Sequence, residues 1–222
     1  MKLTTVYDNV VYPEASATGL TSEWGFSCLI DVSGERILFD TGGDGSILLR
    51  NMERLGIDPE DLTTIVLSHE HWDHTGGLSD LLRTNRDVEV HLLASFSESF
   101  KNKIDNPVVE VRGPAKICDR VYTTGELGTS IKEQSLALET KSGMVVLTGC
   151  AHPGIGEIMD AASGIGDICG IIGGFHGFSD YSLLNGVKFL SPCHCTQHLS
   201  EIVSQFPDAY HKNGVGRVFT FE

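Results

Sequence analysis

The sequence predicts a layered α/β fold in a single domain over residues 1–222. Hydrophobic residues make up 41% of the chain and glycine occurs 25 times, a composition typical of globular proteins with short strands and tight loops. Two strand pairs occur along the chain, and alternating strand and helix patterns follow each of them. Two such halves can pack their sheets face to face with the helices outside.

The first half opens with a hairpin, because the apolar stretches 25–32 and 36–39 flank the turn-forming residues 33–35. Apolar residues at helical spacing then lead to Gly56, which stands where a helix C-cap is expected. The elements predicted here are a helix over 48–55, a strand over 64–67, a helix over 78–82, a strand over 88–93 and a polar helix over 97–104.

The later half repeats this order. A second strand pair covers 135–140 and 144–148, and a Lys-Ser-Gly turn joins its strands. The stretch before it, to about residue 128, shows no clear period. The elements predicted after it are a helix over 155–162, a strand over 168–172, a short helix near Asp180, a strand over 187–190 and a helix over 196–206.

The charge balance disfavours two classes of partner. The chain has 16 basic and 30 acidic residues, so its net charge is -14. Such a chain is repelled at long range by phosphate backbones and anionic lipid surfaces. We therefore expect no nucleic-acid or membrane partner. A local basic patch could still bind an anionic small molecule, and we expect a small-molecule substrate.

The cysteines and the N-terminal sequence indicate a reducing compartment. The six cysteines come without a secretory leader, because the first ten residues contain one lysine and no apolar core. We therefore expect a cytoplasmic protein with free thiols. No run approaches the roughly 18 apolar residues that a membrane span needs.

The most informative segment is Ser68-His69-Glu70-His71-Trp72-Asp73-His74, directly after the predicted strand over 64–67. Three imidazoles and two carboxylates fall within six positions. Zinc, iron and manganese bind such nitrogen and oxygen donors. A tight loop lets His69, His71, Asp73 and His74 converge, and their burial without a cation would be costly. The alternative is an exposed polar loop, which is a weaker interpretation of so dense a cluster.

A metal pair needs more donors than one loop offers, so other strand ends must supply them. The carboxyl ends of strands are where α/β sheets present functional groups. Three histidines each end a predicted apolar strand, namely His152, His176 and His194. Each can instead be a hydrogen-bonded core histidine, and this alternative is strongest for His176. The remaining histidines that we expect to be structural or exposed are His91, His198 and His211.

These residues resemble the metallo-β-lactamase superfamily. The His-x-His-x-Asp-His segment at 69–74, the upstream Phe39-Asp40-Thr41-Gly42 and the later histidine-bearing strand ends are similar to its motifs, from about Leu29 to the C-terminus. The segments 148–154, 173–176 and 192–196 look more narrowly like the branch of dihydropterin-methyl-ribofuranosylaminobenzene-phosphate synthases. Members of that branch are often described only as metal-dependent hydrolases.

The resemblance implies an αββα sandwich and a pair of divalent metal ions, with zinc expected and manganese or iron as alternatives. One ion is expected on His69, His71 and a third histidine, and the other on Asp73, His74 and a late histidine. His194 is the expected late ligand. Asp40 is expected to brace the ligand loop through hydrogen bonds. The candidate metal ligands are therefore His69, His71, Asp73, His74, His152, His176 and His194.

Two positions depart from the pattern of the superfamily. Cys150 stands where many members have a metal-bridging aspartate, and Glu133-Gln134 stands where a histidine is usual. The second departure makes His152 a displaced third ligand. Cys150 is either an unusual thiolate ligand or a small buried packing residue, and we favour packing because free cysteines commonly pack in cores. We expect Cys193 and Cys195 to pack as well.

Hydrolysis is the function that we expect from this site, because paired cations activate water and polarise an electrophile. Asp73 would be both ligand and proton acceptor, and His194 would add a proton route. The branch resemblance implies a small substrate with a pterin or phosphate group. Trp24, Phe175 and Phe178 are candidate stacking surfaces for it, whereas we expect Trp72 to pack.

Three alternative functions stay open. The branch name implies a synthase or transferase of the dihydropterin type. The superfamily scaffold also holds diiron redox sites, although no flavin-binding domain is evident in the sequence, and iron with reducible absorption would favour this class. The third alternative is a non-catalytic metal-binding module, which is disfavoured because mixed histidine and aspartate sets differ from the closed, cysteine-rich sites of structural zinc.

Overall fold

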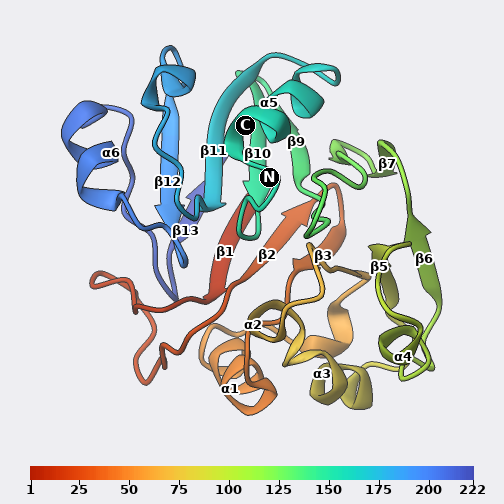
Figure 1. Ribbon diagram of the computed structural model, residues 1–222. Coiled ribbons are helices and arrows are strands. Elements are labelled where there is room, and N and C mark those ends of the chain that lie inside the picture. Colours follow the sequence, from red (N-terminus) through yellow and green to blue (C-terminus); the bar gives the residue numbers. More distant parts are fainter.

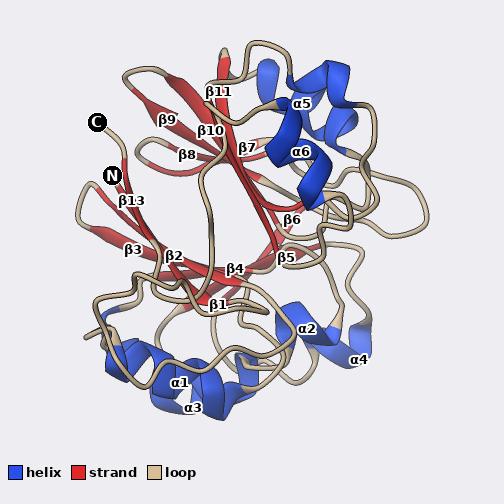
Figure 2. Ribbon diagram, turned by 90° about the vertical axis from the view of Figure 1, so that its left-hand side faces the viewer, coloured by secondary structure: helices blue, strands red, loops and turns tan.

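The computed structural model describes residues 1–222 and has four layers, in which two β-sheets pack face to face between outer helices. Figure 2 shows α1 and α3 outside one sheet and α5 and α6 outside the other. The predicted αββα sandwich is therefore confirmed. None of the helices combines the length and the apolar character that crossing a membrane requires.

The first sheet has seven strands in the order β13-β1-β2-β3-β4-β5-β6. Strands β3 to β6 run parallel to their neighbours, whereas β13, β1, β2 and β3 pair antiparallel. The last strand therefore joins the sheet of the first half, next to the N-terminal strand. The strands are β1 (Lys2–Tyr7), β2 (Ser27–Val32), β3 (Glu35–Phe39), β4 (Thr64–Val66), β5 (Glu89–Leu93), β6 (Val108–Val111) and β13 (Val218–Thr220).

The second sheet has six strands in the order β12-β11-β10-β9-β8-β7. Strands β7 to β10 form an antiparallel meander, and β10, β11 and β12 run parallel to one another. The strands are β7 (Ala115–Cys118), β8 (Val121–Thr123), β9 (Leu136–Thr140), β10 (Gly143–Thr148), β11 (Ile168–Gly174) and β12 (Phe189–Cys193). Figure 1 shows that this sheet is built mainly from the later half of the chain.

Six α-helices and two short 3-10 helices connect the strands. In α1 the Asp44 side chain accepts hydrogen bonds from the backbone N–H groups of Ser46 and Ile47, and Gly56 follows the helix with a φ of 68°. The helices are α1 (Gly45–Arg54), η1 (Pro59–Asp61), α2 (Trp72–Thr75), α3 (Leu78–Thr84), α4 (Glu98–Lys101), α5 (Ile155–Ser163), η2 (Tyr181–Leu184) and α6 (Leu199–Gln205).

Three buried clusters hold the layers together. One fills the space between the sheets and includes Phe39, Leu147 and Ile172. A second packs α1 and α3 on the first sheet, and a third packs α5 and α6 on the second. Apolar residues on both faces of the central strands explain why these strands read as continuous apolar runs in the sequence.

Several predicted boundaries were wrong by a few residues. The predicted helix over 97–104 is reduced to α4, and the predicted strand over 187–190 is displaced to β12. The predicted helix over 196–206 begins only at Leu199, because residues 196 and 197 form backbone hydrogen bonds to Cys193 and His176. Strands β1, β6, β7, β8 and β13 were missed. All five lie at or next to a sheet edge, where short strands give little periodicity.

The fold brings several strand ends to one place. The chain leaves β3 at Asp40, β4 at Leu67, β10 at Gly149 and β12 at His194. The two sheets meet there, since Gln134 donates to the carbonyl oxygen of Leu67 at 2.9 Å. A Cβ atom on Gly149 would lie 2.3 Å from Oγ of Ser68, so only glycine permits this close approach.

Candidate metal centre

The histidine-rich segment forms the loop after β4 and the first residues of α2. Its donors join His152, which follows β10, to make a group of three imidazoles whose possible ligand atoms all lie within 4.8 Å of one another. The ring centroid of His69 lies 4.6 Å from that of His71 and 4.7 Å from that of His152. This set of three nitrogen donors is suited to one divalent cation.

A second donor group lies beside the first. It consists of Asp73, His74, Cys150 and His194, whose possible ligand atoms again lie within 4.8 Å of one another. His74 connects the two groups, because its ring centroid is 4.2 Å from that of His69. Its Nε2 atom lies 3.1 Å from Sγ of Cys150. Loops that follow three different strands therefore supply this second set of donors.

Hydrogen bonds at Nδ1 leave Nε2 of His69 and Nε2 of His194 free to bind a cation. Nδ1 of His69 lies 2.9 Å from Oγ of Ser68, and Nδ1 of His194 lies 3.1 Å from Oδ1 of Asn9. The Nε2 atoms of His69, His152 and His194 are buried and have no hydrogen-bond partner. Buried ring nitrogens without partners are rare and costly, and a cation would satisfy them. The donors therefore fit metal ions.

Burial also keeps two of these imidazoles uncharged. Burial, together with the nearby His74, holds the pKa of His69 well below its ordinary value. Burial and the nearby His71 lower the pKa of His152 to about 4. Neutral imidazole is the form that binds metal, so both side chains are ready to act as ligands near neutral pH.

The carboxylate of Asp73, in the second donor group, is held in its ionised form. Burial alone would raise the pKa of Asp73, but its contacts with His194 and His74 outweigh burial and lower it. Oδ2 of Asp73 lies 3.4 Å from Nε2 of His194 and 3.8 Å from Nε2 of His74. An anionic oxygen at this position complements the positive charge of a cation.

Asp40 braces the ligand loop, as expected. Its carboxylate accepts hydrogen bonds from the backbone N–H and the hydroxyl of Ser68, both at 2.7 Å, and lies 2.7 Å from Nδ1 of His74. Burial alone would lower the pKa of His74, but the charge of Asp40 outweighs it and raises the pKa. Asp40 has a φ of 60°, a strained conformation that places its carboxylate under the loop.

Glu133 has a role that the sequence did not reveal. Its carboxylate is fully buried and accepts hydrogen bonds from the backbone N–H groups of residues 149 to 152, at 2.9 to 3.0 Å, and from the Thr148 hydroxyl. Burial raises its pKa, although the N–H groups oppose this effect. One side chain thus fixes the loop that presents Cys150 and His152. The only signal in the sequence was a glutamate where a histidine is usual.

The N-terminal segment holds His194 in place, which was also missed. Oδ1 of Asp8 accepts the backbone N–H of His194 at 3.1 Å, and Nδ2 of Asn9 donates to its carbonyl oxygen at 2.8 Å. Burial raises the pKa of Asp8 to about 7. His194 has a φ of 50°, so these bonds stabilise an unfavourable backbone conformation. No sequence pattern links residues so far apart.

Other predicted residues lie outside the two donor groups. His176 is exposed, and its ring centroid is 5.1 Å from that of His152, at the rim of the site. His91 bonds to Glu89, and His211 stacks on Phe189, in line with the structural roles expected for them. His198 is half-exposed near Glu201.

The structure corrects two expectations for aromatic residues, Trp72 and Phe175, and shows where Cys150 and Cys193 lie. Cys150 is buried, as expected, and its thiol lies 3.1 Å from Nε2 of His74, within the second donor group. Cys193 does pack between the sheets. Trp72 is 63% exposed instead of packed in the core. Phe175 is buried in the core under α5 and α6, so it does not offer a stacking surface.

Comparisons with known proteins agree with this architecture. A family model described as the metallo-beta-lactamase superfamily matches residues 25–162. The chain is 27% identical to 7,8-dihydropterin-6-methyl-4-(beta-D-ribofuranosyl)-aminobenzene-5'-phosphate synthase of Methanocaldococcus jannaschii over 266 aligned residues, which cover 90% of each protein. It is 30% identical to an uncharacterised protein of the same organism, over 85% of this chain and 88% of the relative.

A solved structure resembles the whole chain. It is Tm1679, described as a metal-dependent hydrolase of the beta-lactamase superfamily, with a TM-score of 0.78 and 26% identity over 100% of this chain and 99% of the other. The family match covers more than half of the chain and includes the ligand loop, and the sandwich fold agrees with it. The chain therefore belongs to the metallo-beta-lactamase superfamily.

Proposed function

We propose that this protein is a metal-dependent hydrolase with two divalent cations in adjacent sites. His69, His71 and His152 hold one cation, and Asp73, His74, Cys150 and His194 hold the other. The observation that supports this most directly is the convergence of buried, unpartnered Nε2 atoms in the two groups. His176 lies outside both groups and is not assigned as a ligand.

Zinc is the cation that this donor set favours. The first group offers three imidazole nitrogens, and the second adds a sulfur atom to nitrogen and oxygen donors. Thiolate and imidazole select zinc over manganese, which prefers oxygen ligands. Iron is the alternative for a site rich in histidine, and the metal content of the purified protein distinguishes the two.

Bound divalent cations supply a nucleophile by lowering the pKa of water, and they polarise the electrophilic oxygen of a substrate. Two side chains of the site would assist this chemistry. Asp73, which its contacts with His194 and His74 keep ionised, would orient the nucleophile by accepting a hydrogen bond from it. His194 borders a cleft open to solvent and adds a route for the proton. We expect a small-molecule substrate.

A synthase is the second candidate, because the relative from Methanocaldococcus jannaschii carries that name and aligns over 90% of each protein. Its name refers to a dihydropterin and to a phosphate-bearing ribofuranosyl-aminobenzene. Both functions use the same site, and they differ in whether water or a second substrate attacks. Activity that requires both a pterin and an aminobenzene riboside would favour the synthase.

The test of hydrolysis uses protein loaded separately with zinc, manganese and iron. Each form is assayed with chromogenic esters, lactones, thioesters and phosphodiesters. We expect turnover of at least one class, and we expect His71→Ala to lose most metal and activity while His198→Ala retains both. Metal-loaded protein that turns over none of these substrates, or His71→Ala protein with full activity, would contradict the proposal.

A further inference from the structure

Both tryptophans of the chain are exposed beside the donor groups. Trp24 is 47% exposed and Trp72 is 63% exposed. Gly43 lies between them, since a Cβ atom there would be 2.6 Å from the Trp72 ring and 2.9 Å from the carbonyl oxygen of Trp24. Tryptophans are enriched at binding interfaces, because an apolar ring there is combined with a polar N–H. Their position next to the donors makes the substrate the natural partner.

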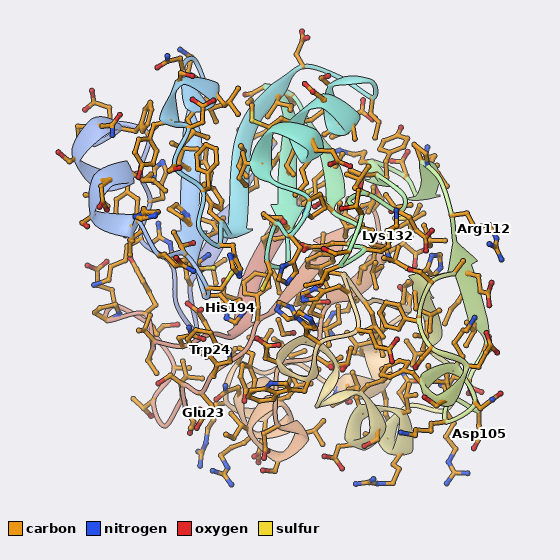
Figure 3. The ribbon with its side chains drawn as sticks, in the orientation of Figure 1. Glu23, Trp24, Asp105, Arg112, Lys132 and His194 are labelled. Atoms are coloured by element: carbon orange, nitrogen blue, oxygen red, sulfur yellow. The ribbon has the colours of Figure 1, made fainter.

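Trp24 is held in one orientation. Its Nε1–H donates to Oδ2 of Asp73 at 2.9 Å, and its ring centroid lies 5.3 Å from that of His194. Figure 3 shows Trp24 and His194 next to each other. The residue that follows, Gly25, lies close to the ligand segment, because a Cβ atom on it would be 2.6 Å from the carbonyl oxygen of Asp73. Because one edge of the indole is held by the hydrogen bond to Asp73, the orientation of its exposed face is fixed.

A cleft lies beside His194, the ring that Trp24 contacts. Val10, Leu199 and His194 line this cleft of about 220 Å³, together with polar residues that include Asn9, Thr196 and Lys212. Other exposed large apolar residues include Val108, Val109 and Val218, which lie on edge strands. None of these three lines the cleft. Apolar surface near a polar metal centre is typical of a pocket that holds the non-reacting part of a substrate.

We propose that Trp24 has two roles, as the positioning residue for Asp73 and as the surface on which a flat aromatic ring of the substrate stacks. The second role rests on the proposed function, because it assigns part of the substrate of that same site. The indole N–H fixes the carboxylate that faces His74 and His194. The exposed indole face then orients the substrate relative to that carboxylate.

A flat ring fits this surface better than an aliphatic group. Offset stacking of another ring on a fixed indole plane contributes binding energy in addition to that of the buried apolar area. The ring of Trp72, which is also exposed, lies against Gly43, and the carbonyl group of Trp24 lies against the same glycine. An aliphatic group would gain only contact area, and it would not be oriented by the plane of the indole. The ring class is thus the feature of the substrate that Trp24 recognises.

Two variants separate the two roles. Trp24→Phe keeps an aromatic face but loses the N–H, whereas Trp24→Leu loses both. Zinc affinity is measured by competition with a chromophoric chelator. Binding of GMP and of ribose 5-phosphate, which differ by the flat base, is measured by calorimetry on the zinc-loaded proteins. In a Trp72→Phe background, the fluorescence of Trp24 reports whether GMP contacts this ring.

We expect both variants to bind zinc about 10- to 100-fold more weakly, as is usual when a partner of a metal ligand is removed. We expect GMP to bind more tightly than ribose 5-phosphate and to quench Trp24. Trp24→Leu should weaken GMP binding about tenfold, and Trp24→Phe should retain it. Ribose 5-phosphate should bind equally to all three proteins.

Three outcomes would overturn the assignment. Unchanged zinc affinity in Trp24→Phe would show that Trp24 does not position Asp73. Equal binding of GMP and ribose 5-phosphate by the wild type, or unchanged GMP binding in Trp24→Leu, removes the stacking role. Wild-type protein that binds no zinc would overturn the proposed metal centre itself, and quenching of Trp24 by GMP in the metal-free protein would still decide whether the ring stacks.

Discussion

Oδ2 of Asp40 lies 2.7 Å from Nδ1 of His74, and both side chains are fully buried. This contact orients the imidazole so that its Nε2 atom lies beside Cys150. The same carboxylate also holds Ser68, whose hydroxyl lies against Nδ1 of His69. One aspartate therefore orients a proposed ligand in each donor group. Such partners tune both the geometry and the basicity of metal ligands.

The Asp40→Asn substitution should weaken metal binding about 10- to 100-fold. Asparagine keeps the size of the side chain, but an NH2 group replaces one of the two carboxylate oxygens. This NH2 group cannot accept a hydrogen bond from His74 or Ser68. Zinc competition titrations measure the effect. Asp61→Asn is the matched control, because Asp61 is an exposed partner of Arg36. Equal affinities in the two variants would contradict the bracing role of Asp40.

The Glu133→Gln substitution should destabilise the protein by about 2–4 kcal/mol. The carboxylate accepts four backbone N–H groups, and the amide of glutamine would turn an N–H donor toward at least one of them. Urea unfolding measures the loss. Glu139→Gln, at an exposed position, should change the free energy of unfolding by less than about 0.5 kcal/mol. Similar values for both variants would argue against the anchoring of the loop.

Asp8 should make the metal-free protein less stable as the pH rises. Burial raises the pKa of Asp8 from 3.8 to about 7, so the folded state keeps the proton that the unfolded state releases. The stability linked to Asp8 is complete below pH 3.8 and is lost as the pH rises toward about 7. The free energy of unfolding of wild-type protein, relative to Asp8→Asn, should therefore fall by a few kcal/mol between about pH 4 and pH 8. A constant difference would contradict this.

Cobalt reports whether sulfur is a ligand. With Cys150 in the second donor group, cobalt-substituted protein should show a sulfur-to-cobalt charge-transfer band in the near ultraviolet. Cys150→Ser should abolish this band. Cys195→Ser should keep it, because Sγ of Cys195 lies against the carbonyl oxygen of Cys150 and is outside the donor group. A band that survives in Cys150→Ser would return Cys150 to a packing role.

The parts of the fold and site that could be predicted were those encoded by neighbouring residues. The segment 69–74 is contiguous, so its potential as a donor cluster for metal is evident from the sequence, and apolar runs located β2, β3, β9 and β10. Strand β1 was missed although its Thr-Thr-Val run is rich in β-branched residues. It pairs with β13, which contains only three residues and gives almost no pattern.

The parts that could not be predicted depend on distant contacts. The bond between Asp8 and the backbone of His194 joins residues 186 positions apart. Glu133 acts by collecting backbone N–H groups, which every sequence offers equally. The direction of the Cys150 thiol depends on the turn around Ala151, whose φ of 57° is unusual for a non-glycine residue. Composition and periodicity contain no information on such geometry.

The most direct test of the metal centre is anomalous diffraction at the zinc edge, from crystals of protein purified without chelators and supplied with zinc. We expect two anomalous peaks in each chain. One should lie among His69, His71 and His152, and the other among Asp73, His74, Cys150 and His194. Crystals without a peak at either group, or with these side chains turned toward solvent, would contradict the proposed centre and the hydrolytic function that depends on it.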